Sequence, residues 1–230
     1  ENATGEFIWI AECDDYAAPT FLEELVHIMQ NDKTIKIGFS NSYWVTPERT
    51  FINRRCTIKK TSKIYNGKKF IKSHMLKGNY IYNASMAIFR RDSIPYTDFD
   101  YKNYKSCGDK LFWISIANTG KVLYLCKPLN YFRIHSNKVT NKSIANGTLF
   151  KEEYKLYLKN IHNGYINLFN RGSIISYFLQ SIHDKQHEFQ TNDIYEECLS
   201  LWKHETDYHN NSLPLLYRLF YYFKGIKDQK

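Results

Sequence analysis

Three carboxylates lie within four residues near the start of the sequence. Glu12, Asp14 and Asp15 follow the apolar segment Glu6–Ala11, whose composition predicts a short buried strand. Carboxylates this close repel one another, and hard oxygen ligands of this kind suit Mg²⁺ or Mn²⁺. Ligands of open α/β sheets also gather at the carboxyl ends of strands. The cluster therefore predicts a metal and phosphate site; the alternative is that Asp14 or Asp15 caps a helix beginning near Pro19.

Asp109 is a second residue with the chemistry for catalysis. It follows Gly108 and opens an apolar, helical pattern that runs to Asn118 and is closed by Gly120. A carboxylate at a helix start acts either as a general base or as an N-cap. The helix dipole stabilises the charged carboxylate and so makes a weaker base. Both interpretations remain open from these residues alone.

A third group lies on a predicted strand near residue 133. Alternation puts Tyr131, Arg133 and His135 on one side of this strand and Phe132 and Ile134 on the other. A histidine just past a strand end can ligate a metal, and an arginine can clamp phosphate. The alternative for His135 is an ordinary surface histidine.

The charge of the chain is uneven. The net charge is +9 over 230 residues, and the stretch from Arg54 to Lys77 holds nine Lys and Arg residues and no acid. This basic stretch is expected to attract phosphates or an anionic membrane surface, the alternative being a solvated face. Nucleic acid is not expected as a partner, because no binding motif accompanies the charge.

The cysteines indicate a reducing compartment. Their number is five, which is odd, and no CxxC pair occurs, so neither a disulfide framework nor a zinc site is indicated. No apolar run reaches the length that spans a membrane. We expect a cytoplasmic protein, either free or at the inner face of the cytoplasmic membrane.

The remaining pattern predicts an α/β fold. A helix beginning near Pro19 is expected to bury one apolar face. Further strands are expected at 36–45, 81–90, 121–125 and 129–135, with Pro128 breaking the last two apart. Further helices are expected at 67–77 (capped by Asn66), 109–118, 148–170, 173–183, 192–205 and 213–223. The expected architecture is a mixed sheet flanked by helices over residues 1–140, followed by a helical region over residues 141–230.

In their order, these motifs resemble family 2 glycosyltransferases of the GT-A fold. That family carries its metal-binding DxD motif in a pattern such as A-x-G-E-F-I-x-x-x-D-x-D-D-Y-x-x-P-x-F-L-E. An acidic residue then precedes L-x-W/L-x-x-A-x-x-G-K, and P-L-x-Y-R-x-H follows. The matching residues, over about residues 3–140, are Ala3, Gly5 to Ile8, Glu12, Asp14 to Tyr16, Pro19, Phe21 to Glu23, Asp109, Leu111, Trp113, Ala117, Gly120, Lys121, Pro128, Leu129, Tyr131, Arg133 and His135.

The resemblance implies roles for the acidic residues. Asp14 matches the metal-bridging aspartate of DxD, and Asp15 matches the third acidic position. Glu12 stands where the family has the first aspartate, which faces the ribose or the metal, and it is longer by one methylene. Asp109 matches the catalytic base. His135 matches a ligand of the metal or diphosphate.

The resemblance also implies a reaction. A sugar would pass, with inversion, from a UDP-, GDP- or dTDP-sugar to a saccharide or lipid-linked saccharide acceptor, with Mg²⁺ or Mn²⁺ as cofactor and Arg133 helping to bind the diphosphate. The setting implied is bacterial cell-surface polysaccharide synthesis. Because βα units before the DxD strand normally hold the base and ribose, we expect that N-terminal segment to be missing here, and the fragment to be inactive if it is needed.

Three other classes of function remain open from the sequence. One is a catalytically inactive glycan-binding domain, and another is a metal-dependent phosphodiesterase or nuclease built on Glu12, Asp14 and Asp15. The third is a nucleic-acid-binding protein, which only the basic stretch favours. Metal and nucleotide would not bind to the inactive domain, and the phosphodiesterase would cleave a phosphodiester without a sugar acceptor. Nucleotide-sugar hydrolysis would count against the nucleic-acid-binding protein, which a salt-dependent gel shift would support.

The end of the sequence is apolar and aromatic. Leu213–Phe223 contains Arg218 as its one charged residue. Such a helix packs internally, pairs with a second copy in a homodimer, or lies on a membrane surface. Internal packing predicts that Leu216 and Phe220 are buried, and membrane contact predicts that they are exposed.

Overall fold

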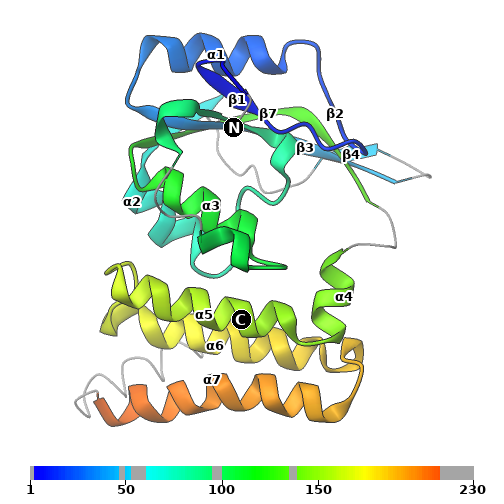
Figure 1. Ribbon diagram of the computed structural model, residues 1–230, viewed down its shortest axis with the longest axis vertical. Helices are drawn as coiled ribbons and strands as arrows, with labels where there is room; N and C mark the ends of the chain where they lie inside the picture. The colour runs from blue at the N-terminus through cyan, green and yellow to red at the C-terminus, as the bar shows by residue number, and fades with distance from the viewer. Residues whose placement is uncertain (1–2, 47–49, 53–60, 95–99, 135–138, 213–230) are drawn as a thin grey trace. The chain divides into compact units, whose positions relative to one another are not determined.

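The computed structural model describes residues 3–46, 50–52, 61–94, 100–134 and 139–212 (Figure 1). The chain divides into two compact units. The first, called here the sheet unit, comprises Glu1–Asn103 and Gly108–Asn137. The second, called the helical unit, comprises Tyr104–Cys107 and Lys138–Lys230.

The sheet unit is built on one mixed sheet with the strand order β1-β6-β3-β7-β2. Strand β4 pairs with β3, and β5 pairs with β7. Only β3 and β7 run parallel among the described strands; the other pairs are antiparallel. The strands are β1 (Phe7–Trp9), β2 (Tyr16–Ala17), β3 (Ile35–Val45), β4 (Thr50–Ile52), β5 (Ser62–Asn66), β6 (Ala87–Arg90) and β7 (Lys121–Arg133).

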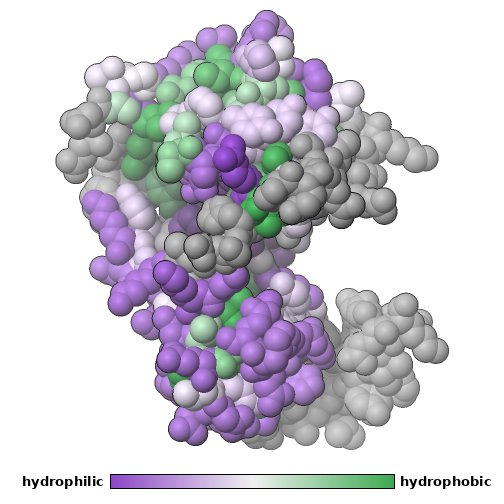
Figure 2. Space-filling view, turned by 90° about the vertical axis from the view of Figure 1, so that its right-hand side faces the viewer, coloured by the Kyte–Doolittle hydropathy of each residue, from purple (hydrophilic) through white to green (hydrophobic). Residues whose placement is uncertain are grey.

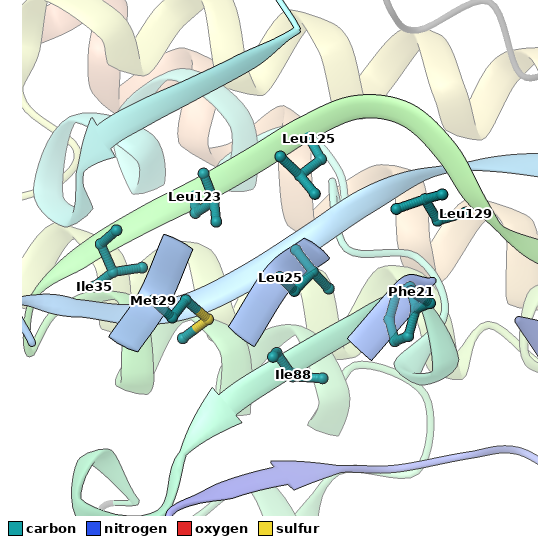
Figure 3. Packing of buried hydrophobic residues seen from close by; sticks show 8 residues of the cluster. All are labelled: Phe21, Leu25, Met29, Ile35, Ile88, Leu123, Leu125 and Leu129. Atoms are coloured by element: carbon teal, nitrogen blue, oxygen red, sulfur yellow. The ribbon is translucent and has the colours of Figure 1, made fainter. Parts of the chain in front are cut away.

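Helix α1 (Phe21–Asn31) covers one face of this sheet (Figures 1 and 3). Its apolar stripe consists of Phe21, Leu25 and Met29, and all three side chains are buried. They pack against strand residues that include Ile88 and Leu123. The spacing of four residues places one side chain per turn on the sheet, which is why the apolar period in the sequence predicted this helix.

Helices α2 (Gly67–Phe70) and α3 (Gly108–Ala117) lie on the opposite face (Figure 1). Phe89, the neighbour of Ile88 in β6, makes an edge-on contact with Trp113 of α3 at 5.7 Å between ring centroids. Phe70 of α2 contacts Phe39 of β3 at 5.8 Å. Successive strand residues thus point to opposite faces, and both faces are buried under helices.

The helical unit contains α4 to α7. The helices are α4 (Val139–Ala145), α5 (Thr148–His162), α6 (Leu168–Asp184) and α7 (Asn192–Ser212). Trp202 of α7 is fully buried and stacks on Phe178 of α6, with ring centroids 4.3 Å apart. The face of this unit that is seen in Figure 2 is largely hydrophilic, as expected for amphipathic helices that share one core.

A buried carboxylate joins three helices of the helical unit. Glu205 accepts hydrogen bonds from the hydroxyls of Tyr154 and Tyr157, both at 2.9 Å, and forms an ion pair with Arg171. Arg171 also donates to the Tyr157 hydroxyl at 2.7 Å. Burial opposes ionisation of Glu205, but the hydrogen bonds from Arg171 and the two tyrosines prevail and lower its pKa.

A second buried carboxylate fixes the loop of this unit that precedes α3. Glu152 accepts hydrogen bonds from the backbone N–H groups of Lys105, Ser106 and Cys107 at 2.8, 2.8 and 2.9 Å. The three N–H donors offset the cost of burying the Glu152 carboxylate, and each of the three loop amides has a hydrogen-bond acceptor.

The α/β class and the mixed sheet flanked by helices are confirmed. The expected helix at 67–77 is present as α2, capped by Asn66, whose side chain accepts from Lys69 N, and continues as a π-helical turn over Ile71–Met75. The helix expected at 109–118 is α3.

Pro128 does not break the strand, contrary to the prediction. Strand β7 runs through it without interruption, because Pro128 pairs with Asn41 between two register shifts. At such a bulge the ladder does not need the N–H that proline lacks.

The predicted strand at 81–90 was also wrong over its first half. Only Ala87–Arg90 is strand, and Ala84–Met86 forms a 3₁₀ turn. Asn83 and Ser85 use their side chains for hydrogen bonds to another loop, which competes with a regular ladder.

The single helix predicted at 148–170 is two helices. Helix α5 ends at His162, Gly164 adopts a left-handed φ of 71°, and α6 begins after Asn167. Asn167 and Asn170 form a reciprocal capping box, a helix start that the apolar pattern did not reveal.

Several predictions fall outside the described residues. They concern His135, the segment of the basic stretch from residue 54 to 60, and the apolar tail with Leu216 and Phe220. Within the part of the chain that is described, no helix combines the length and the apolar character needed to cross a membrane.

We predict that Glu205→Ala lowers the free energy of unfolding by about 3–5 kcal/mol, because it leaves the charge of Arg171 buried without its partner. The matched control is Glu197→Ala, which removes an exposed ion pair with Lys151 and should cost about 0–1 kcal/mol. Urea unfolding at pH 7 measures both.

The effect of Glu205 should depend on pH. A carboxylate whose pKa is lowered by folding stabilises the fold above its ordinary pKa of 4.5 and loses that contribution as the pH falls below it. The difference between wild type and Glu205→Ala should therefore shrink on acidification. Equal losses for Glu205→Ala and Glu197→Ala at pH 7 would contradict this account.

Candidate active site

The predicted acidic cluster forms a turn between β1 and β2, called here the acid loop (Glu12–Asp15). The amide of Asp15 donates to the carbonyl of Glu12 at 3.2 Å. The side chains of Glu12 and Asp14 are exposed, and that of Asp15 is half-buried. Two of the three carboxylates are thus open to a ligand from solvent.

The acid loop is held by a segment far away in the sequence. Ser85 Oγ accepts from the amide of Glu12 at 2.8 Å, and the amide of Ala84 donates to Glu12 Oε2 at 3.3 Å. Asn83 donates through Nδ2 to Asp15 Oδ2. The Asn83–Ser85 turn therefore fixes both ends of the loop.

Asp15 also connects the loop to the end of β7. Its Oδ1 accepts from the backbone N–H of Arg133 at 2.9 Å. The structure thereby brings Arg133, a predicted phosphate ligand, next to the acid loop through its backbone, while the Arg133 side chain is exposed. With Asn83 on its other oxygen, Asp15 has a structural role in the loop.

Asp109 lies in the first turn of α3 and is exposed. Its Oδ1 accepts from the amide of Lys110 at 2.7 Å, and its Oδ2 accepts from Asn79 Nδ2 at 2.8 Å. These two hydrogen bonds fix the orientation of the carboxylate. Each carboxylate oxygen has a second lone pair, so a substrate hydroxyl can still donate to Asp109.

The segment Asn79–Ser85 connects Asp109 with the acid loop, because Asn79 binds Asp109 while Asn83 and Ser85 bind the loop. Although Glu12 is exposed over much of its surface, partial burial of its carboxylate raises its pKa, and the charge of Asp15 raises it further. The N–H of Ala84 lowers this pKa in part, and the charge of Asp14 and, by the smallest contribution, that of Asp109 add to the increase.

The helix-cap alternative for the acid loop is wrong. Helix α1 begins at Phe21, and Thr20 occupies its cap position. Asp15 instead accepts from Asn83 and Arg133, as described above. Helix capping therefore does not account for the carboxylates of the loop.

Among the described residues, no group of three or more His, Cys, Asp or Glu side chains is placed to hold a metal ion. Hard cations such as Mg²⁺ are commonly held by one or two carboxylates together with phosphates and waters. Glu12 and Asp14 are exposed and have oxygens of this kind.

Sequence reasoning missed the polar residues that position this site. Asn83 and Ser85 lie in the segment predicted as a strand, and Asn79 lies just before it. Three hydrogen-bonding side chains within seven residues were the available signal, because such residues compete with a ladder. Their partners could not be read from the sequence.

A pocket of about 570 Å³ lies elsewhere in the sheet unit. It is bordered by Ile28 of α1 and by Leu125 to Lys127 of β7. None of the predicted site residues lines it, so it does not bear on the chemistry of the acid loop.

We predict that Glu12→Gln raises the free energy of unfolding at pH 7, by less than about 1 kcal/mol because the side chain is exposed and screened. A carboxylate whose pKa is raised by folding stabilises the fold when protonated and loses that contribution as the pH rises above its ordinary 4.5. The gain should vanish below that pH and shrink when Mn²⁺ is added.

Thermal unfolding measures this effect, and Glu23→Gln is the matched control, since Glu23 is an exposed carboxylate of α1. The control should change little. A loss of stability in Glu12→Gln at pH 7 would contradict a raised pKa of Glu12.

Two comparisons with known proteins found no match for this sequence. No protein-family model matches the sequence, and no curated protein matches it either. Inferences about the chemistry of the site therefore depend on the residues and contacts described above and on the motif resemblance.

Proposed function

We propose that this protein is an inverting glycosyltransferase that uses a nucleotide-sugar donor and has a catalytic domain of the GT-A kind. One observation carries the proposal: the segment Asn79–Ser85 hydrogen-bonds Asp109 through Asn79 and the acid loop through Asn83 and Ser85, so it holds the candidate base and the acidic cluster on one short stretch of chain. A base beside a phosphate-binding acidic loop is the arrangement that direct displacement at a sugar carbon requires.

In the proposed reaction, Asp109 accepts the proton of an acceptor hydroxyl. The hydroxyl oxygen attacks the anomeric carbon of the donor sugar, and the bond from that carbon to the nucleoside diphosphate breaks, so the configuration inverts. Asn79 and the amide of Lys110 keep the carboxylate of Asp109 oriented. The exposure of Asp109 leaves room for the acceptor.

Asp14, with Glu12 beside it, is the residue we propose to hold Mg²⁺ or Mn²⁺. The cation would supply positive charge opposite the diphosphate leaving group. The exposed side chain of Arg133 is proposed to bind the same diphosphate. His135, the further ligand implied by the resemblance, lies outside the described residues.

We predict that Asp109→Asn reduces sugar transfer about 10²- to 10⁴-fold, because amide oxygens do not accept the hydroxyl proton as a carboxylate does. Nucleotide-sugar binding and thermal stability should persist. A screen of UDP-, GDP- and dTDP-sugars with Mn²⁺ provides the assay. Asp193→Asn, at an exposed aspartate in the first turn of α7, is the matched control.

The result that would refute the assignment is a variant that keeps more than about a tenth of the wild-type rate. Unchanged transfer in Asp193→Asn would show that the loss does not come from a helix-dipole effect shared by both sites.

We predict that Asp14→Ala weakens Mn²⁺-dependent binding of the nucleoside diphosphate about tenfold or more, because loss of even an outer partner of a metal commonly costs that much. Isothermal titration calorimetry with and without EDTA measures the effect. Glu23→Ala should bind as the wild type does. Equal affinities for wild type and Asp14→Ala, with or without EDTA, would contradict a metal at the acid loop.

A further inference from the structure

Three tyrosines stack across three strands of the sheet. Tyr16 of β2 and Tyr43 of β3 are both register partners of Tyr131 in β7. The ring of Tyr131 lies 4.4 Å from that of Tyr16 and 4.9 Å from that of Tyr43, at interplanar angles of 12° and 23°. We call this row the tyrosine ladder.

The outer end of the tyrosine ladder is exposed. Tyr16 lies on β2, at the end of the strand order, and is 45% exposed, whereas Tyr43 and Tyr131 are half-buried. Its preceding residue, Asp15, is held by Asn83 and by the amide of Arg133. The Tyr16 ring is thus pre-oriented, which reduces the entropy lost when a ligand binds to it.

The ladder also lies where ligands of such sheets bind. Tyr43 and Tyr131 are near the carboxyl ends of β3 and β7, the parallel pair, and open α/β sheets bind ligands at that edge. Exposed Asp14 lies two residues before Tyr16. Exposed Arg133 lies two residues after Tyr131, on the same side of β7.

An exposed tyrosine ring matches a sugar ring, because it offers an apolar face to the C–H groups of the sugar. Glu12, Asp14 and Arg133 are proposed above to bind the cation and the diphosphate of the donor. The exposed face of Tyr16 beside them is then left for a ring that carries no charge of its own. The ladder therefore fits the acceptor better than the donor nucleotide.

We propose that the tyrosine ladder is the platform on which a sugar ring of the acceptor stacks, with Tyr16 as the contact residue. The inference rests on the proposed glycosyltransferase function and adds the class of acceptor, a saccharide with a neutral ring, and the place where it binds.

The test is saccharide binding by the full chain, measured by saturation-transfer NMR. The probes are neutral oligosaccharides of glucose, galactose, mannose and N-acetylglucosamine, with uridine as a separate nucleoside probe. Tyr16→Ala should weaken oligosaccharide binding about tenfold, whereas Tyr16→Phe, which keeps the ring, should bind as wild type. Tyr177→Ala is the matched control, at a tyrosine of α6 that is 42% exposed.

Three results would overturn the proposal. In the first, Tyr16→Ala binds the oligosaccharides as tightly as the wild type does. In the second, the wild type binds no oligosaccharide at about 10 mM. In the third, Tyr16→Ala loses uridine binding and keeps oligosaccharide binding. Circular dichroism shows whether Tyr16→Ala is folded. If it is not, Tyr16→Leu replaces it, because leucine removes the flat ring and keeps an apolar side chain. Tyr16→Leu must then show the same loss of binding, about tenfold.

This outcome is separable from that of the proposed function. Transfer that depends on Asp109 together with unchanged oligosaccharide binding in Tyr16→Ala would refute the platform alone. Oligosaccharide binding that depends on Tyr16, together with equal rates of transfer by the wild type and Asp109→Asn, would keep the platform and refute the proposed mechanism of transfer.

Discussion

The parallel pairing of β3 with β7 is the interaction on which the sheet unit depends. Every other described strand except β1 pairs with one of these two, and β1 pairs with β6. The pairing passes a bulge at Asn41 and Pro128 and then resumes. Directly after the bulge, buried Ser42 donates through its hydroxyl to Asn130 Oδ1 at 3.0 Å.

That hydrogen bond joins the register partners Ser42 and Asn130 at the point where the pairing resumes. A slip of the pairing by one residue would turn each later side chain to the other side of the sheet. Tyr131 would then leave the tyrosine ladder, and the amide of Arg133 would no longer meet Asp15. The candidate site therefore depends on the register of β3 against β7 beyond the bulge.

The acid loop shows how a fold can hold like charges together. Partial burial raises the pKa of Glu12, and repulsion from the neighbouring carboxylates, that of Asp15 first, adds to the increase. Hydrogen bonds from Asn83 and from the backbone of Ala84 and Arg133 hold the carboxylates in place. The helical unit follows the same rule, with Glu152 and Glu205 each buried among several donors.

The sequence by itself determined the local elements and the chemical character of the site. The pattern of apolar residues predicted α1 and β3, and Asn66 as a helix cap predicted α2. The clustered carboxylates indicated the acid loop. These features depend on residues near one another in the chain. Tertiary structure alone decided that Asn83 and Ser85 hold the loop, that Pro128 lies in a bulge, and that Asn79 of the same segment binds Asp109. Each of these depends on pairing between distant segments, whose register no local pattern of residues specifies.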